Sequence, residues 1–301
     1  MGKPLALLLL LGANLLWSST NVVAKIAFGA LTPLQVSAGR MIVAGLVALP
    51  WLARYQARRA LPAQAWPKVA ALGLVGFALS KFLYLWGLNL TTATDTSLLI
   101  AVEPLFTIAL GAAVLGEALS RRRLAAFAVG ALGAYLLIAR GLRPPSLAAA
   151  HVVGDLVVML SLTCEAALSV LGKSLVRRFP AAQVTAAAFV VALCVWLPLA
   201  LADGLATGWP PLEAGPLAAI VYLALGCTVL PYWAWFRALE ELDAGVVALT
   251  LFAQPLVGAL LALLLLGEPL HAATVAGGAL VLFSLYLALG LPLRPARRLQ
   301  A

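Results

Sequence analysis

Leu98–Glu117, LLIAVEPLFTIALGAAVLGE, recurs later in the chain as Leu249–Glu268, LTLFAQPLVGALLALLLLGE. At a constant offset of 151 residues, seven of the twenty positions are identical, including Pro104 with Pro255 and the final Gly-Glu pair. Since the chain has 301 residues, this offset divides it into two copies of one unit. Solenoid repeats are only about 20–50 residues long, so a repeat of this length indicates two large apolar halves instead.

The composition is that of an integral membrane protein. Hydrophobic residues make up 64% of the chain and charged residues 10%, with a mean hydropathy of +1.05, whereas soluble domains are about 25% charged. Apolar stretches of about 17–25 residues, each long enough to cross the hydrocarbon core as a helix, recur along the whole chain. We therefore expect an all-α integral membrane protein without a separate soluble domain.

The apolar pattern predicts ten transmembrane helices, at residues 4–27, 33–52, 67–89, 94–115, 122–140, 153–175, 183–202, 215–237, 245–266 and 272–292. The repeat places five of them in a first domain, residues 1–145, and five in a second, residues 146–301. The three cysteines all fall in apolar runs, and their odd number implies no disulfide framework.

The placement of lysine and arginine predicts the orientation. If the N-terminus is cytoplasmic, fifteen of the twenty basic residues lie at the cytoplasmic side and three at the opposite side, with Arg40 and Lys81 inside spans. This asymmetry indicates a protein of the inner membrane with both termini in the cytoplasm. The net charge of +9 therefore reflects topology, and we expect no nucleic-acid partner.

Five spans per repeat is an odd number, so the second half must cross the membrane in the opposite direction to the first. The loops agree, because Arg121–Arg123 follow the first copy of the repeated block, whereas only His271 follows the second. An inverted repeat of this kind is found in secondary transporters, which bind substrate near the bilayer midplane between the repeats.

Two stretches of the first half carry a family resemblance. LLWSSTNVVAKIAF at Leu15–Phe28 and TSLLIAVEPLFTIALGAAVLGE at Thr96–Glu117, with the second-half copy ending LLLLGE, resemble the drug/metabolite transporter superfamily and its EamA-type ten-helix members. The resemblance implies a carrier that exports small metabolites, amino acids among them. It also implies a central cavity lined mainly by helices 1, 3, 4, 6, 8 and 9, with helices 5 and 10 as scaffold.

Polar stripes along the first and sixth spans agree with that lining. One stripe is Asn14, Ser18, Asn21 and Lys25, and the other is Ser161, Glu165, Ser169 and Lys173. Their steps of three and four residues place each stripe on one helix face. Polar side chains are costly in lipid, so the stripes should face protein or a water-filled cavity. The alternative is that they only hydrogen-bond neighbouring helices.

Four ionisable residues lie well inside spans, namely Arg40, Lys81, Glu103 and Glu165. Lys81 and Glu103 stand about eleven residues either side of one turn, hence at equal depth, and one interpretation is that they neutralise each other. The four charges sum to zero, which suits a zwitterion or a small neutral solute. Lys81 or Arg40 would then bind a carboxylate, and Glu103 or Glu165 an ammonium group.

A buried carboxylate can also carry a proton, which would couple export to the proton gradient. The repeat partner of Glu103 is Gln254, so this role would belong to one half only. Tyr84, Tyr232, Trp17 and Trp86 lie within spans and can wall a cavity for an apolar side chain, although aromatics in spans are more often core or lipid-facing.

Pro104 and Pro255 lie at matching positions of the two copies. Each removes a backbone hydrogen bond, so we expect kinks that serve as hinges, or that only assist packing. Gly116 and Gly267 should end these helices, leaving Glu117 and Glu268 near the start of the next helix as structural caps.

These features favour a secondary carrier of small amphipathic metabolites, with amino acids first, working by rocking of the two halves. Hydrophobic cations and, by exchange, sugar phosphates are the alternative substrates. We expect no enzyme, because His151 and His271 lie in or beside loops and no metal-ligand spacing is present. We expect no cofactor and no metal. Span 5 carries a small-residue ridge, Ala126, Gly130 and Ala134, that suits helix packing and allows a homodimer.

Overall fold

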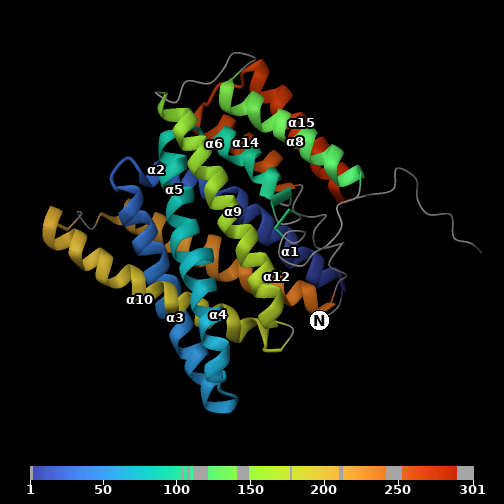
Figure 1. Cartoon of the computed structure of the whole chain (residues 1–301). Coiled ribbons are helices and arrows are strands. Elements are labelled where there is room, and N and C mark those ends of the chain that lie inside the picture. The colour runs from blue at the N-terminus through green and yellow to red at the C-terminus, as the bar shows by residue number, and fades with distance from the viewer. Residues whose placement is uncertain are drawn as a thin grey trace, which may run out of the picture.

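The computed structural model describes residues 3–103, 105–106, 109–110, 121–140, 149–176, 178–209, 213–241 and 253–289. In these residues the chain consists of helices joined by short turns (Figure 1). Pro104 and Glu117, together with Gly116 and part of the first copy of the repeated block, lie outside the described residues, so the predictions made for them are not tested.

The first half contains the helices that were predicted, several of them in pieces. In order they are α1 (Lys3–Ser18), α2 (Thr20–Ala27), α3 (Pro33–Arg58), the 3₁₀-helix η1 (Ala63–Ala65), α4 (Trp66–Ala71), the π-helix η2 (Leu72–Leu79), α5 (Ser80–Leu90), α6 (Ala93–Leu99), the 3₁₀-helix η3 (Ile100–Val102) and α8 (Arg121–Ala139). The 3₁₀ turn η3 begins at Ile100, four residues before Pro104. In a helix, a proline ring clashes with the backbone carbonyl four residues earlier.

The second half repeats this order. Its helices are α9 (Ala150–Val176), α10 (Ala181–Thr207), α11 (Ala214–Val221), the π-helix η4 (Tyr222–Val229), α12 (Leu230–Glu241), α14 (Ala253–Leu266) and α15 (Ala272–Leu289). A π-helix therefore interrupts the third span of each half, at positions 150 residues apart. Sequence reasoning missed this feature, because both segments are as apolar as the helices around them.

Five helical segments among the described residues are long and apolar enough to cross a membrane, and four shorter apolar helices accompany them. With α1 and α2 they fall on the ten predicted spans, as far as the structure describes those spans. The helices run past the apolar stretches: α3 ends at Arg58 and α10 at Thr207, six and five residues beyond the predicted ends. Hydropathy marks the part of a helix in hydrocarbon, and a helix can continue into the polar interface.

Helices of the two halves pack in pairs related by the repeat. The equivalent helices α3 and α10, α6 and α14, and α8 and α15 each pack against each other, while α5 packs on α9 and α1 on α12 (Figure 1). Spans 2, 4 and 5 of the first half thus pack against the equivalent spans of the second half. Span 1 packs against the equivalent of span 3, and span 3 packs against the equivalent of span 1. This exchange is what a pseudo-two-fold axis between the halves produces.

Glycines allow the closest of these approaches. A Cβ atom on Gly133 would lie 2.8 Å from the Gly277 carbonyl oxygen, and one on Gly130 would lie 2.4 Å from Leu105 Cδ1. The small-residue ridge of α8 is therefore used within the chain, against α15 and the fourth span. This agrees with the scaffold role expected for spans 5 and 10, and it leaves the homodimer without support from this ridge.

Two hydrophobic clusters form the core, and each contains residues from both halves. The larger cluster joins α2, α5, α6 and α8 to α9, η4, α14 and α15. The smaller cluster joins α3, α4 and η2 to α10. Both clusters combine helices of the two halves, and the rocking of one half against the other stays a prediction.

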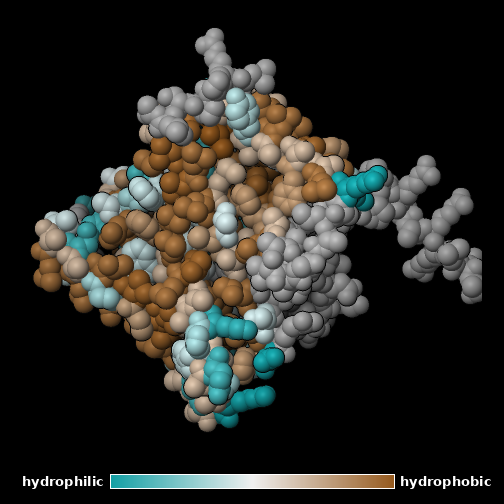
Figure 2. Space-filling model, in the orientation of Figure 1, coloured by the Kyte–Doolittle hydropathy of each residue, from teal (hydrophilic) through white to brown (hydrophobic). Residues whose placement is uncertain are grey.

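The surface is largely apolar (Figure 2). Large hydrophobic side chains such as Leu8, Leu205 and Leu264 are more than 60% exposed, while Asn14, Arg40 and Asp155 are almost fully buried. Polar residues gather in Figure 2 at the ends of the bundle, for example at the lower tip where α3 ends and α4 begins. This distribution is expected for a protein whose sides face lipid.

Candidate functional site

The two π-helices place polar groups in the middle of the bundle. Arg40 of α3 is 3% exposed, and it donates from Nε to Thr228 Oγ1 at 2.6 Å and from an η nitrogen to the Cys227 carbonyl at 3.1 Å. Thr228 in turn donates to the Leu223 carbonyl five residues earlier, at 2.8 Å. A π-helix spaces its backbone hydrogen bonds more widely and is frequent at functional sites. Arg40 thus binds η4 through two of its donors.

A buried ion pair joins the two halves where η2 passes into α5. Lys81 Nζ lies 2.5 Å from Glu165 Oε1, and Ser80 Oγ donates to the same oxygen at 3.1 Å. The side chains are 9% and 17% exposed. Of the two interpretations of Lys81 and Glu103, mutual neutralisation is not what the structure shows: Lys81 forms its ion pair with Glu165 of α9.

Glu103, at the end of η3, is half-buried, and its carboxylate makes no hydrogen bond or salt bridge to a described residue. It interacts electrostatically with Glu165 and Lys81. The same interactions link a set that we call the midspan cluster, formed by Arg40, Lys81, Tyr84, Glu103, Glu165 and Tyr232. Within this set, Lys81 contacts Glu165 and the Tyr232 ring directly, and the other members interact with these residues electrostatically.

Aromatic rings form a wall beside the ion pair. Tyr232 lies with its ring centroid 5.8 Å from Lys81 Nζ, and it meets the rings of Trp17 at 5.4 Å, Phe77 at 5.2 Å and Phe189 at 6.1 Å. Phe77 and Phe189 were missed, because nothing in an apolar run distinguishes a wall residue from a lipid-facing one. Their T-shaped contacts are typical of aromatic packing.

Trp86 does not belong to this wall. It is 42% exposed and stacks on Phe82, so it lies on the outside of α5. Trp17, in contrast, also meets Trp235 at 5.7 Å.

The polar stripe of the first span serves several neighbours. Gln254 Nε2 donates to Asn14 Oδ1 at 2.7 Å, and Ser18 Oγ lies 3.3 Å from the Gln254 carbonyl. Asn21 accepts from the Tyr84 hydroxyl at 2.6 Å and donates to Ser97 Oγ at 2.7 Å. These contacts tie α1 and α2 to α14, α5 and α6, as the helix-packing alternative requires.

Some of the other predicted residues are not among those that the structure describes. The side chain of Ser169 and all of Pro104 lie outside the described residues. Pro255 is buried in the first turn of α14, and the residues before that helix are likewise not described, so its role as a hinge stays a prediction.

A second group of polar residues gathers at the other end of α5 and α9, and we call it the cap cluster: Lys25, Thr91, Thr94, Asp95, Arg140, Asp155 and Glu268. Glu268 accepts from the Ala93 amide at 2.9 Å and from the Thr94 amide and hydroxyl at 2.8 Å each. Gly267, with φ of 66°, ends the preceding helix as predicted. The predicted capping role is right in kind, but Glu268 caps α6 of the opposite half and not α15.

Three further contacts complete the cap cluster. Lys25 Nζ donates to the Thr91 carbonyl at 2.5 Å, Thr91 Oγ1 to Asp155 at 2.6 Å, and Arg140 pairs with Asp95 at 3.0 Å. Asp95 and Asp155 were missed because they stand near predicted span ends. The signal that marks Asp95 was present: Thr92, three residues earlier, is the N-cap of α6 and accepts from the Asp95 amide.

Comparison with known proteins identifies the family to which the chain belongs. The profile of the EamA-like transporter family matches residues 4–139 and again residues 152–290. An "Uncharacterized transporter" of Archaeoglobus fulgidus is 28% identical over 93% of this chain and 96% of its own length. A "Probable amino-acid metabolite efflux pump" of Salmonella typhimurium is 27% identical over 90% of each chain.

A "Probable terminal-alkyne amino-acid exporter" of Streptantibioticus cattleyicolor is 28% identical over 88% of this chain and 86% of its own. A crystal structure with 24% identity superposes with a TM-score of 0.62 over 94% of this chain and 96% of the other, and it supports the fold. With both halves matched, the chain belongs to the EamA-like transporters of the drug/metabolite transporter superfamily, and is a multi-pass membrane transporter of small molecules and not an enzyme.

Proposed function

We propose that this transporter exports amino acids or closely similar zwitterions by alternating access around the midspan cluster. The observation that carries the proposal is the buried Lys81–Glu165 pair beside the Tyr232 ring wall. A substrate carboxylate would bind Lys81, its ammonium group would bind Glu165 or Glu103, and its side chain would lie against Trp17 and Tyr232. The printed names of the Salmonella and Streptantibioticus relatives support this substrate class.

The helix arrangement supports an exchange between two states. The ion pair links α5 of the first half to α9 of the second, so a substrate that replaces it loosens one contact between halves and can favour another arrangement. The basic residues favour an inner-membrane location with cytoplasmic termini. The division into domains at 1–145 and 146–301, and hinges at Pro104 and Pro255, complete the proposal.

The test is counterflow in proteoliposomes. Vesicles are loaded with an unlabelled neutral amino acid, and entry of the same labelled amino acid is followed for the wild type, Lys81→Gln and Glu165→Gln. We expect exchange in the wild type and its loss in both variants. Glu213→Gln is the matched control, since Glu213 is an exposed carboxylate before α11 that caps no amide with its side chain. Full exchange in Lys81→Gln would contradict the proposal.

A hydrophobic cation is the second candidate, and one observation favours it: the Glu103 carboxylate has no hydrogen-bond or salt-bridge partner among the described residues and lies near the aromatic wall. The same vesicles, loaded with a hydrophobic cation, separate the two candidates. Exchange of the cation alone, lost in Glu103→Gln but retained in Lys81→Gln, would replace the amino acid as substrate.

A further inference from the structure

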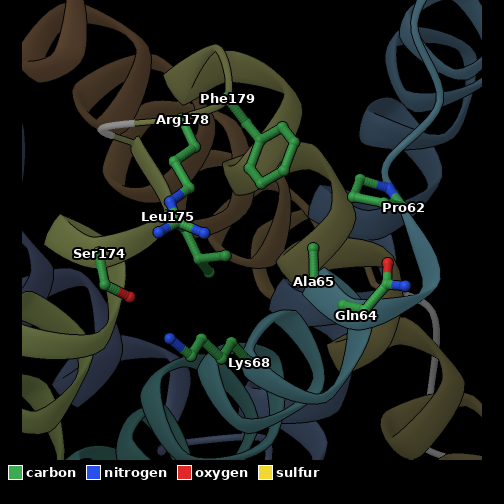
Figure 3. Close-up of a pocket in the computed structure, with 8 residues that line it drawn as sticks. All are labelled: Pro62, Gln64, Ala65, Lys68, Ser174, Leu175, Arg178 and Phe179. Atoms are coloured by element: carbon green, nitrogen blue, oxygen red, sulfur yellow. The ribbon is translucent and has the colours of Figure 1, made fainter.

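A hollow of about 170 Å³ opens at one end of the bundle, far from the midspan cluster. Its wall is formed on one side by η1 and the start of α4 and on the other by the end of α9 and the turn that follows (Figure 3). Lys68 precedes Lys81 by thirteen residues in the third span, which at 1.5 Å per residue is roughly 20 Å. The hollow is therefore separate from the proposed substrate site.

Two cations point into this hollow from different halves of the chain. In Figure 3, Lys68 and Arg178 extend towards each other across it, and the Ser174 hydroxyl lies at its edge. Neither Lys68 nor Arg178 has an acidic partner among the residues that the structure describes. Like charges repel, and an anion between them is attracted to both. The arrangement therefore suits a ligand with negative charge.

The lining also matches the chemistry of a phosphate group. Lys68 and Arg178 supply charged donors, the Gln64 amide supplies a neutral one, and the buried Leu175 also lines the hollow. The Ser174 hydroxyl donates to the Leu171 carbonyl at 2.8 Å. Guanidinium and ammonium groups bind phosphate oxygens with charge-assisted hydrogen bonds.

The place of the hollow favours a lipid as the source of that phosphate. It lies where Trp66 begins α4, and tryptophan is enriched at the membrane–water interface. By the distribution of basic residues this end faces the cytoplasm, and basic pockets between transmembrane helices on that side bind anionic head groups. We propose that the hollow binds the phosphate of an anionic phospholipid, which bridges Lys68 of the first half and Arg178 of the second.

The experiment measures the Tm of the purified full-length protein in detergent with added phosphatidylglycerol, and with phosphatidylcholine of the same acyl chains. A ligand that binds only the folded state raises its stability. We expect phosphatidylglycerol to raise the Tm of the wild type more than phosphatidylcholine does. The variant Lys68→Gln/Arg178→Gln should lose at least about half of this difference, because it removes both charged contacts.

The matched control is Arg54→Gln/Arg58→Gln, which removes the same charge from the same end of the molecule but outside the hollow. It should keep the full lipid effect, and an equal loss in both double variants would overturn the proposal in favour of a diffuse charge effect. If inorganic phosphate alone gave the wild type the same rise, the lipid assignment would be wrong. Should the double variant not be purified, the single variants Lys68→Gln and Arg178→Gln carry the same comparison.

Discussion

The midspan cluster and the cap cluster lie on the same helix interface and use their charges differently. Thr91 meets Asp155 at one end of the contact between α5 and α9. Lys81, ten residues before Thr91, meets Glu165, ten residues after Asp155. At the cap end, backbone amides and hydroxyls bind Glu268 and Asp155, with three donors on Glu268 alone, and Arg140 pairs with Asp95. At midspan the Glu165 carboxylate binds only the Lys81 ammonium and the Ser80 hydroxyl among the described residues, and the Tyr232 ring lies beside Lys81.

This difference separates a structural use of polar groups from a functional one. A carboxylate bound by helix amides has its hydrogen-bonding capacity used by the fold, whereas Glu103 keeps its capacity among the described residues. The cap cluster is not complete, because Asp155 Oδ2 and Arg140 Nε lack partners in the described part of the chain. Even so, its bonds join the start of α6 to the ends of α14 and α8. We therefore expect substitutions in the cap cluster to lower stability more than they change substrate binding.

The largest effect should come from breaking the midspan pair on one side only. Glu165→Gln leaves the Lys81 ammonium buried without its counter-charge, which costs about 3–5 kcal/mol in comparable buried pairs. We expect a marked fall in Tm together with loss of counterflow. The double variant Lys81→Met/Glu165→Leu replaces the pair by apolar groups, which is often neutral for stability, so its Tm should recover while transport stays absent.

That double variant decides between the two uses of the pair. Recovery of both Tm and transport would show that the charges only hold α5 to α9, and the comparison with the cap cluster would fail.

The next effect concerns the helix contact that both clusters share. A Cβ atom on Gly154 would lie 2.7 Å from the Gly87 carbonyl oxygen and 2.9 Å from the Thr91 amide nitrogen. Gly154→Ala should therefore separate α9 from α5 and destabilise the protein by about 1–3 kcal/mol, as overpacking does. Both Tm and transport should fall. Gly215→Ala, with nothing within 4 Å of the added Cβ, is the control; an equal loss there would contradict this reason.

A smaller effect is expected at the cap of α6. Glu268→Ala removes the acceptor of the Ala93 and Thr94 amides, which costs about 0.5–2 kcal/mol for a helix cap. Amide hydrogen exchange at Ala93 and Thr94 should become faster, with a modest fall in Tm and an unchanged apparent KM. Glu213→Ala, which removes no side-chain cap bond, should change none of these. A large rise in KM for Glu268→Ala would place this residue in the substrate site.

The sequence predicted most of the fold, because the cost of polar groups in lipid is visible residue by residue. It gave the spans, the repeat and the residue types that meet at midspan. It did not give the partner of Lys81, since counting from a turn fixes depth along a helix but not the direction in which a side chain points. That direction depends on the packing of α5 against α9, which no local pattern encodes.

The cap of α6 was unpredictable for a related reason. Glu268 is far from Ala93 in sequence, and the contact exists only because α14 packs beside α6. The π-helices could not be predicted either, since LGLVGFAL at Leu72–Leu79 and YLALGCTV at Tyr222–Val229 have the composition of ordinary apolar helices. The sequence pattern thus identified polar residues that are unusual within apolar spans, and tertiary packing determined what each of them contacts.

The smallest effects should separate the aromatic wall from the lipid-facing surface. Trp17 meets Tyr232 and Trp235, whereas Trp86 is 42% exposed and stacks only on Phe82 among the described rings. An aromatic pair contributes about 0.5–1.5 kcal/mol beyond burial, so Trp17→Leu should raise the apparent KM for an apolar amino acid by about 2- to 10-fold. Trp86→Leu should leave it unchanged, because lipid replaces the lost contact. Kinetics in proteoliposomes with an apolar and a small amino acid measure both, and a loss confined to the apolar substrate would assign Trp17 to its side chain. Equal KM values in the two variants would instead move the wall away from the substrate and leave the ion pair as the only recognised part of the site.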